Sequence, residues 1–432
     1  MTPRLALFLA ALLSVSFSAS SAIKQLERNP LEEAEAALRN QDVAGALRAL
    51  DAVLKATPEH PAARFWRGRL YAEKGEFDKA LADLNEAVRL TPRNTDALAH
   101  RGYVHQKSGR RDDALTDFNQ ALRVDAQNEF ALYCRGLLLG ERGDTRAAIA
   151  DLDAVLELSP NHADALHSRG QIHLLRREWD EALNDFDRGL AMNPKDPIGH
   201  TGRGAVHFMQ GEFRAAAEDY TKASELQPKD PRPLAQRGYA RSALGENDQA
   251  LADFDAALRL DPKHGPALLG RAELRRVAKQ WAAAQHDYEA VLTLAPDDFR
   301  ALLGRASIFQ ASGALEKALA AYADIVKRYP EEPQPFNDYA WLLATGTKDD
   351  LRDGKRAVEL AARACELTEW QNSAYVDTLA AAYAEVGDFS TAVKWQQLAV
   401  KQSEKEPADV QDDIKSRVSI YEQKKPYREE LK

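Results

Sequence analysis

One interval organises most of this sequence. Prolines recur every 34 residues, or once after 68, and Ala126 stands where the missing proline is expected. A fixed internal period of roughly 20 to 50 residues indicates a repeat architecture, in which each unit covers the apolar face of the next. Such an array grows in length rather than in diameter, so the 432 residues need not form two or three globular domains. The prolines are Pro58, Pro92, Pro160, Pro194, Pro228, Pro262, Pro296 and Pro330.

Each interval contains two amphipathic segments of about a dozen residues joined by a turn, which predicts a helical hairpin. Three positions recur in each hairpin. The first segment carries a small residue, the second segment carries an alanine, and a large apolar residue follows that alanine by one helical turn. Glycine costs about 1 kcal/mol inside a helix, so its recurrence indicates that the helices pack closely. The small residues are Gly68, Gly102, Gly136, Gly170, Gly204, Gly238, Ala272 and Ala306; the alanines are Ala80, Ala114, Ala148, Ala182, Ala216, Ala250, Ala284 and Ala318; the large residues are Leu84, Phe118, Leu152, Phe186, Tyr220, Phe254, Tyr288 and Tyr322.

A 34-residue hairpin with Leu-x-x-x-Gly in its first helix, Ala-x-x-x-Phe/Tyr in its second and a closing proline resembles the tetratricopeptide repeat. The resemblance covers residues 27–406. It implies an all-α fold, a right-handed superhelical solenoid of about eleven hairpins with a C-terminal capping helix. The predicted hairpins span residues 27–60, 61–94, 95–128, 129–162, 163–196, 197–230, 231–264, 265–298, 299–332, 333–372 and 373–406.

The ends of such an array must cover an apolar face that has no further neighbour. Residues 407–432 are therefore predicted to form a capping helix that ends before Pro426, followed by a polar tail. Residues 345–354 lengthen the turn of the tenth hairpin and are expected to form a loop. The apolar residues that recur at helical spacing in the capping segment are Val410, Ile414, Val418 and Tyr421.

Arginine precedes the small position in eight successive hairpins, and seven of these carry aspartate sixteen residues later. The exception is Arg305, which has Ala321 at that place. We expect each pair to meet between two helices as an ion-pair ladder that fixes the register of the hairpins. The alternative is a basic strip that binds carboxylates or phosphates, which the matched aspartates disfavour. The pairs are Arg67 with Asp83, Arg101 with Asp117, Arg135 with Asp151, Arg169 with Asp185, Arg203 with Asp219, Arg237 with Asp253 and Arg271 with Asp287.

Composition and motifs argue against nucleic-acid binding and catalysis. The net charge of −9 repels phosphates on average, and no phosphate loop, dinucleotide fingerprint or nucleophile elbow occurs. Histidine recurs at His105, His173 and His207, but without a His-x-x-x-His or Cys-x-x-Cys spacing, so packing is favoured over metal binding. We expect no cofactor, metal or catalytic residue, and we expect Cys134 and Cys365 to be buried free thiols.

The first 22 residues are interpreted as a secretory signal peptide. Arg4 precedes an apolar run, and the small residues Ser20 and Ala22 predict cleavage before Ile23. The alternative is an uncleaved anchor, which the shortness of the run disfavours. No later segment is apolar enough to cross a membrane. We therefore expect export to a periplasmic or extracellular location.

What remains for function is a binding surface. The resemblance implies that first helices line a concave groove, so we expect a non-catalytic scaffold that binds a protein or peptide along that face. The alternatives are an assembly factor for cell-envelope or surface-polymer machinery and an enzyme with a site near the 345–354 loop, which offers no nucleophile with a base. The candidate groove residues are Phe65, Arg69, Tyr103, Phe130, Tyr133, His167, Gln171, Phe208, Tyr239, Arg276, Asn337 and Trp341.

Overall fold

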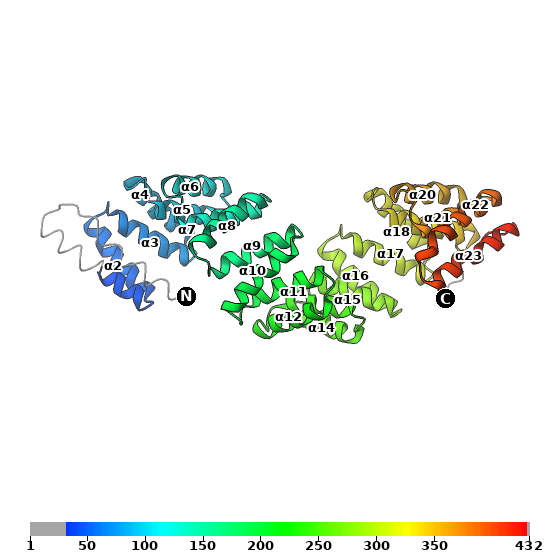
Figure 1. Ribbon diagram of the computed structural model, residues 1–432, viewed down its shortest axis with the longest axis horizontal. Helices are drawn as coiled ribbons and strands as arrows, with labels where there is room; N and C mark the ends of the chain where they lie inside the picture. The colour runs from blue at the N-terminus through cyan, green and yellow to red at the C-terminus, as the bar shows by residue number, and fades with distance from the viewer. Residues whose placement is uncertain (1–31, 430–432) are drawn as a thin grey trace. The chain divides into compact units, whose positions relative to one another are not determined.

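The computed structural model describes residues 32–429, and within this range every regular element is a helix (Figure 1). Consecutive helices pack against each other along the chain. The predicted all-α repeat fold is confirmed. The predicted signal segment, residues 1–22, lies outside the described residues.

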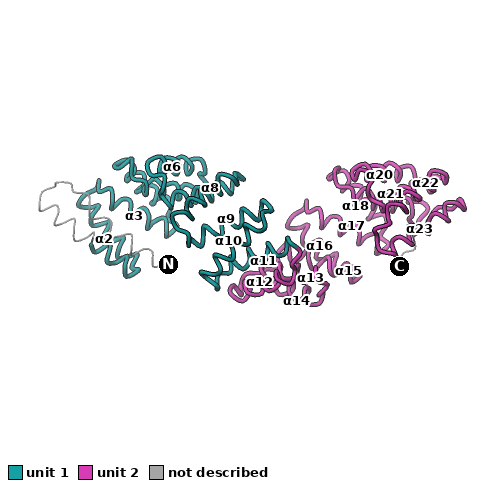
Figure 2. The backbone as a smooth tube through the Cα atoms, viewed as in Figure 1, with its two compact units in different colours: residues 1–210 teal, residues 211–432 magenta. Residues whose placement is uncertain are grey.

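The chain divides into two compact units between Gln210 and Gly211 (Figure 2). In the first unit, a helix over residues 32–39 precedes α2 (Val43–Ala56), α3 (Pro61–Glu73), α4 (Phe77–Leu90), α5 (Thr95–Lys107), α6 (Arg111–Val124), α7 (Glu129–Glu141), α8 (Thr145–Leu158), α9 (Ala163–Leu175), α10 (Trp179–Met192) and α11 (Pro197–Met209). The second contains α12 (Phe213–Leu226), α13 (Pro231–Ala243), α14 (Asn247–Leu260), α15 (Gly265–Val277), α16 (Trp281–Leu294), α17 (Phe299–Ala311), α18 (Leu315–Arg328), α19 (Pro333–Thr345), η3 (Asp349–Leu351), α20 (Gly354–Leu367), α21 (Ser373–Val386), α22 (Phe389–Gln402), η4 (Ser403–Lys405) and α23 (Ala408–Glu422).

Capping hydrogen bonds and left-handed turn residues define the helix ends at regular intervals. The side chain before most first helices accepts a hydrogen bond from a backbone N–H two or three residues later, which satisfies a donor that the helix leaves open. These caps are His60, Asn94, Asn128, His162, Asp196, Asp230, His264 and Asp298. The turn between the first and second helix of a hairpin needs one residue with a left-handed backbone conformation. This residue is usually glycine, as at Gly245 with φ 78°. Arg177 and Lys279 adopt the same conformation, with φ 60° and 57°, and carry a side chain there.

The small and large positions form the core. The eight repeated alanines are fully buried, and the large side chains that follow them are between 0% and 3% exposed. The close approach is evident at Gly238, where a Cβ atom would lie 2.7 Å from Cε1 of Phe254. The packing therefore has no room for a side chain at this crossing.

The C-terminal end differs in one respect from the predicted apolar cap. Helix α23 buries Ile414 and Tyr421, but Val410 is 38% exposed, and Arg417 is buried in the same face. The reason is electrostatic: Asp377 of α21 is also buried, and Arg417 forms an ion pair with it at 2.9 Å. The connection between α19 and α20 contains the short 3-10 helix η3 and is tied down by an ion pair between Arg352 and Glu385 at 2.9 Å.

Candidate partner-binding face and groove

The arginine ladder lies between first and second helices. In six hairpins the arginine donates from both Nε and Nη2 to the two carboxylate oxygens of the aspartate sixteen residues later, at 2.6 to 3.0 Å. The six aspartates are buried, and the arginine side chains are only 15% to 24% exposed. The six arginines, Arg67, Arg101, Arg135, Arg169, Arg237 and Arg271, are thus occupied and do not form a free basic strip. Arg203 and Asp219 belong to different units, and their pairing stays a prediction.

Seven arginines of the ladder make a further contact that the sequence pattern did not reveal. In each, the Nη1 atom donates to the residue sixteen positions earlier, on the second helix of the preceding hairpin, at 2.5 to 3.2 Å. One guanidinium therefore connects three helices and two hairpins. The acceptors are Asp51, Asn85, Asn119, Asp153, Asp187, Thr221 and Asp255. At Arg305, where Ala321 replaces the aspartate, the buried Nε atom has no hydrogen-bond partner among the described residues.

Two predicted groove residues, Phe65 and His167, are buried by neighbouring side chains. Phe65 is 8% exposed, and its ring packs edge-on against His100 of the next first helix. His167 is 5% exposed, and its Nδ1 atom lies 3.0 Å from a carboxylate oxygen of Asp196. Both side chains are therefore largely covered within the chain, and their part in binding a partner stays a prediction.

Other predicted groove residues are half-buried by neighbouring side chains. Phe130 stacks on His100 at 4.4 Å between ring centroids, and Tyr133 stacks on His162 at 5.1 Å. Burial lowers the pKa of His100 to about 4, so its imidazole is neutral at pH 7. These histidines bridge successive first helices, and they were not recognised from the sequence because neither position recurs as an aromatic in every hairpin.

The remaining candidates in this region keep more of their surface. The Tyr239 hydroxyl donates to the backbone carbonyl of Pro266 at 2.6 Å, Arg69 lies over the Trp66 ring at 5.1 Å, and Gln171 is exposed. Tyr103 and Phe208 are half-buried. Of these five, Gln171 is the most open to a partner.

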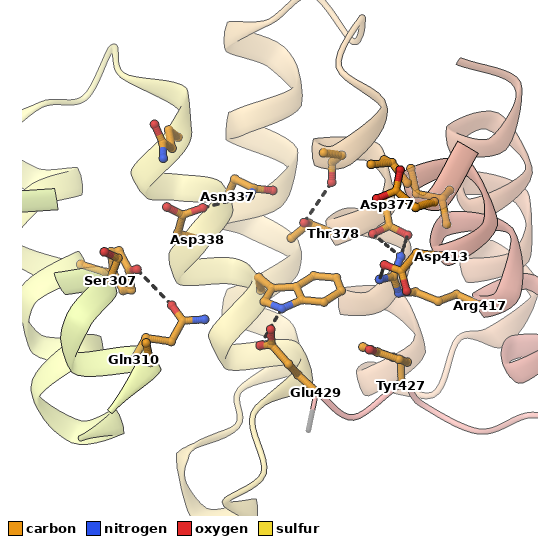
Figure 3. A pocket seen from close by; sticks show the side chains of 18 of the residues that line it. Ser307, Gln310, Asn337, Asp338, Asp377, Thr378, Asp413, Arg417, Tyr427 and Glu429 are labelled. Atoms are coloured by element: carbon orange, nitrogen blue, oxygen red, sulfur yellow. Dashed lines mark hydrogen bonds and ion pairs between the residues drawn. The ribbon is translucent and has the colours of Figure 1, made fainter. Parts of the chain in front are cut away.

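A groove with a cavity volume of about 970 Å³ lies in the second unit (Figure 3). It brings together three predicted residues, Arg276 of α15 and Asn337 and Trp341 of α19. Figure 3 shows Asn337 and Asp338 between Ser307 and Gln310 on one side and Thr378 on the other. The groove is thus built mainly from first helices, together with Trp281 of α16, Tyr322 of α18, α23 and the residues after it.

The polar floor of the groove centres on Asp338. Burial raises the pKa of this carboxyl to about 6, although the hydrogen bonds from the side chains of Asn337 and Gln334 act to lower the pKa. The amide Nδ2 of Asn337 donates to Asp338 at 3.2 Å, while its Oδ1 atom is buried with no hydrogen-bond partner in the described structure. The groove therefore presents acceptors that are short of donors.

One wall of the groove is the buried Arg417. Its guanidinium binds Asp377 and Asp413 and lies over the rings of Trp341, at 5.1 Å, and Tyr427, at 4.8 Å. Burial raises the pKa of Asp377, which the neighbouring arginine opposes. The Nη atoms of Arg417 are thus paired within the chain, its buried Nε atom has no hydrogen-bond partner among the described residues, and the guanidinium packs on the indole of Trp341.

The segment that was predicted as a polar tail packs on α19. The indole Nε1 of Trp341 donates to the Glu429 carboxylate at 2.8 Å, and the backbone N–H of Glu429 donates to the carbonyl of Thr345 at 3.0 Å. Arg428 forms an ion pair with Glu385 at 2.6 Å. Residues 427–429 thus close one end of the groove, and one edge of Trp341 is occupied by the chain itself.

Several other features bear on function. In the part of the chain that the structure describes, no group of three histidine, cysteine, aspartate or glutamate residues could hold a metal ion. Among the helices between residues 32 and 429, none combines the length and apolar character needed to cross a bilayer. Cys134 and Cys365 are buried free thiols, and burial raises the pKa of each to about 12.

Comparisons with known proteins agree with the geometry of the hairpins. One family model described as tetratricopeptide repeat matches residues 31–95, 133–197, 176–231, 236–284 and 275–333, and a second matches residues 95–128. No curated protein matches the chain at a significant level.

Several solved structures are similar to this chain. The Cut9–Hcn1 hetero-tetramer of the APC/C matches 91% of this chain and 96% of its own chain, at 14% identity and a TM-score of 0.50. A tetratricopeptide repeat protein of Parabacteroides merdae matches 66% of this chain and 99% of its own, at 18% identity and a TM-score of 0.43. The pilF protein of Pseudomonas aeruginosa matches 50% and 96%, at 21% identity and a TM-score of 0.45. With family models matching well over half of its length, the chain belongs to the tetratricopeptide repeat family.

Proposed function

We propose that this protein is a non-catalytic scaffold that binds a protein or peptide partner along the face lined by its first helices. The tetratricopeptide repeat fold generally mediates protein–protein interaction, and its members are generally non-catalytic. The observation that carries the proposal for this chain is the groove of the second unit, where first-helix side chains surround an open volume of about 970 Å³. The repeated large residues of the second helices lie mainly in the core, and of the second helices only Trp281 of α16 and Tyr322 of α18 line this groove.

The arginines support a distinction between residues that stabilise the scaffold and residues that bind a partner. Six of the arginines in the repeats are held by buried carboxylates, so the regular positions stabilise the scaffold. Partner recognition then falls to residues that differ between hairpins, such as Gln171, Gln310 and Trp341. Aromatic and polar anchors of this kind are typical of binding surfaces.

Site-specific photo-crosslinking tests the proposal. We would place p-benzoylphenylalanine at Gln171 or Asn337 on first helices, and at Glu181 or Lys317 on exposed positions of second helices as matched controls. We expect a partner to be crosslinked from the first-helix positions and not from the controls. Crosslinking of the same partner mainly from the second helices would contradict the proposed face.

We also propose that the protein is exported, on the basis of residues 1–22 alone. The pattern of Arg4, the following apolar run and the small residues before Ile23 supports cleavage. Mass measurement of the mature N-terminus in the native host is the test. A chain that begins at Ile23 is expected, whereas one that keeps Met1 and fractionates with the membrane would favour the anchor.

A further inference from the structure

The unused acceptors in the second-unit groove indicate the chemistry of its occupant. We infer that the groove takes a basic side chain, lysine or arginine, from an extended segment of the partner, with Asp338 as the anion that receives it. This inference rests on the proposed function and adds to it a class of ligand and an anchoring residue.

The first argument is the environment of Asp338. Its carboxylate is largely removed from water, and its hydrogen bonds come from the neutral amides of Asn337 and Gln334. Between residues 32 and 429 no lysine or arginine forms an ion pair with it, in contrast to the ladder aspartates. A desolvated carboxylate without a cation is costly, and a cation that enters the groove would offset that cost.

The second argument is the orphaned oxygen of Asn337. Its amide nitrogen must face the Asp338 carboxylate, because the reverse orientation would place two acceptors 3.2 Å apart. The Oδ1 atom is then left buried without a donor. An ammonium or guanidinium group offers several N–H donors and could serve both Asp338 and Asn337, which lie side by side in Figure 3.

The third argument is the charge balance of the lining. The basic residues are Arg276, Lys279 and Arg417, and the acidic ones are Asp338, Asp377, Asp409, Asp413 and Glu429. Arg417 is already paired with two of these carboxylates, and Arg276 is paired with Glu273 at 3.1 Å. The lining residues of the groove therefore carry an excess of negative charge. An acidic ligand would find no unpaired guanidinium among them.

The titration of Asp338 gives the inference a pH signature. Two titratable groups interact with Asp338, Tyr322 of α18 and Tyr375 of α21, and the charged Arg276 of α15 and Glu429 of the tail line the same groove. Burial raises the pKa of both tyrosines, so they stay neutral between pH 5 and 8. With a pKa of about 6, the Asp338 carboxyl is mostly ionised at pH 7.5 and mostly protonated at pH 5. Binding of a cation is therefore expected to weaken about tenfold as the pH falls through this range.

The probe is a matched pair of peptides measured by isothermal titration calorimetry with the full chain. One is an acetylated and amidated nonapeptide of alanine and glycine with a central arginine, and the other carries citrulline, which keeps the shape and lacks the charge. At pH 7.5 we expect the arginine peptide to bind at least about tenfold more tightly. Equal affinities for the two peptides, or no binding of either, would overturn the inference.

Two charge variants show whether the position matters. Asp338→Asn keeps the size of the side chain and removes the anion, so we expect it to abolish the preference for arginine. Asp409→Asn removes one charge from an exposed position on the same groove and should change the preference less than about twofold. Equal losses in the two variants would show that net charge, rather than Asp338, attracts the peptide. A fall in the NMR-measured pKa of Asp338 on addition of the arginine peptide provides a readout that does not depend on a folding change.

The failure of this inference is distinguishable from failure of the proposed function. If the first-helix crosslinks form while the two peptides bind alike, the scaffold function stands and the basic-side-chain specificity is wrong. If a partner is crosslinked only from second helices, the proposed binding face is wrong as well.

Discussion

Replacement of Asp287 with alanine tests the ion-pair ladder where it is most buried. The Asp287 side chain is fully buried and accepts hydrogen bonds from Arg271, at 2.9 and 2.7 Å, and from Arg275, at 2.7 Å. Removing one partner of a buried ion pair costs about 3–5 kcal/mol, because the remaining charge is left uncompensated. The arginine side chains are 17% and 23% exposed, and Arg271 keeps its contact with Asp255 at 2.6 Å. We therefore expect the lower end, a loss of about 3 kcal/mol.

The matched control is Asp255→Ala, which removes the other carboxylate from the same arginine. The Asp255 side chain is 42% exposed, so its loss should cost at most about 1 kcal/mol. Urea denaturation compares the midpoints, and hydrogen exchange of α15 and α16 measures the local effect, because a long array can open at one hairpin. If the two variants destabilised these helices equally, the argument that burial makes the aspartate indispensable would be refuted.

Three further predictions follow from the same packing. Ala321→Asp should supply the missing carboxylate for Arg305 and stabilise the hairpin by about 1 kcal/mol, measured by urea denaturation; a destabilised variant would contradict the orphaned guanidinium. Gly304→Ala should destabilise by about 1–3 kcal/mol because the new Cβ atom would overlap the Tyr288 ring, whereas Gly265→Ala, which meets nothing within 4 Å, should be nearly neutral; similar melting of the two would refute the close approach. The two buried cysteines, each with its pKa raised to about 12, should resist thiol reagents at pH 8 until urea is added, and rapid labelling of the native protein would show that they are accessible.

The ladder shows what periodicity can and cannot predict. The aspartate sixteen residues after each arginine recurs in seven hairpins, so the repetition itself identified the pairing. The acceptor sixteen residues before it varies among aspartate, asparagine and threonine, as at Asp51, Asn85 and Thr221. Because the residue type varies at this position, no repeat is evident in the sequence. All three kinds of side chain nevertheless offer an oxygen to the arginine sixteen residues later.

The groove was only partly foreseen for a related reason. Arg276, Asn337 and Trp341 were selected by their places in a first helix, whereas Asp338 has no counterpart that repeats along the chain. The contact between Trp341 and Glu429 joins residues 88 positions apart, which no local pattern anticipates. The burial of Phe65 was not foreseen, because one side of its first helix packs against His100 of the neighbouring hairpin.

The sequence by itself determined the hairpins, their 34-residue period and the small-to-large packing, because these depend on contacts that are local and repeated. The positions of Gly238 against Phe254 and of Arg271 against Asp287 follow from that spacing. Only the tertiary structure decided which aromatic residues are covered by the next helix and where acceptors remain without donors. Burial and hydrogen-bond satisfaction depend on every element that surrounds a side chain, and in the second unit these include the last described residues of the chain, folded back onto α19.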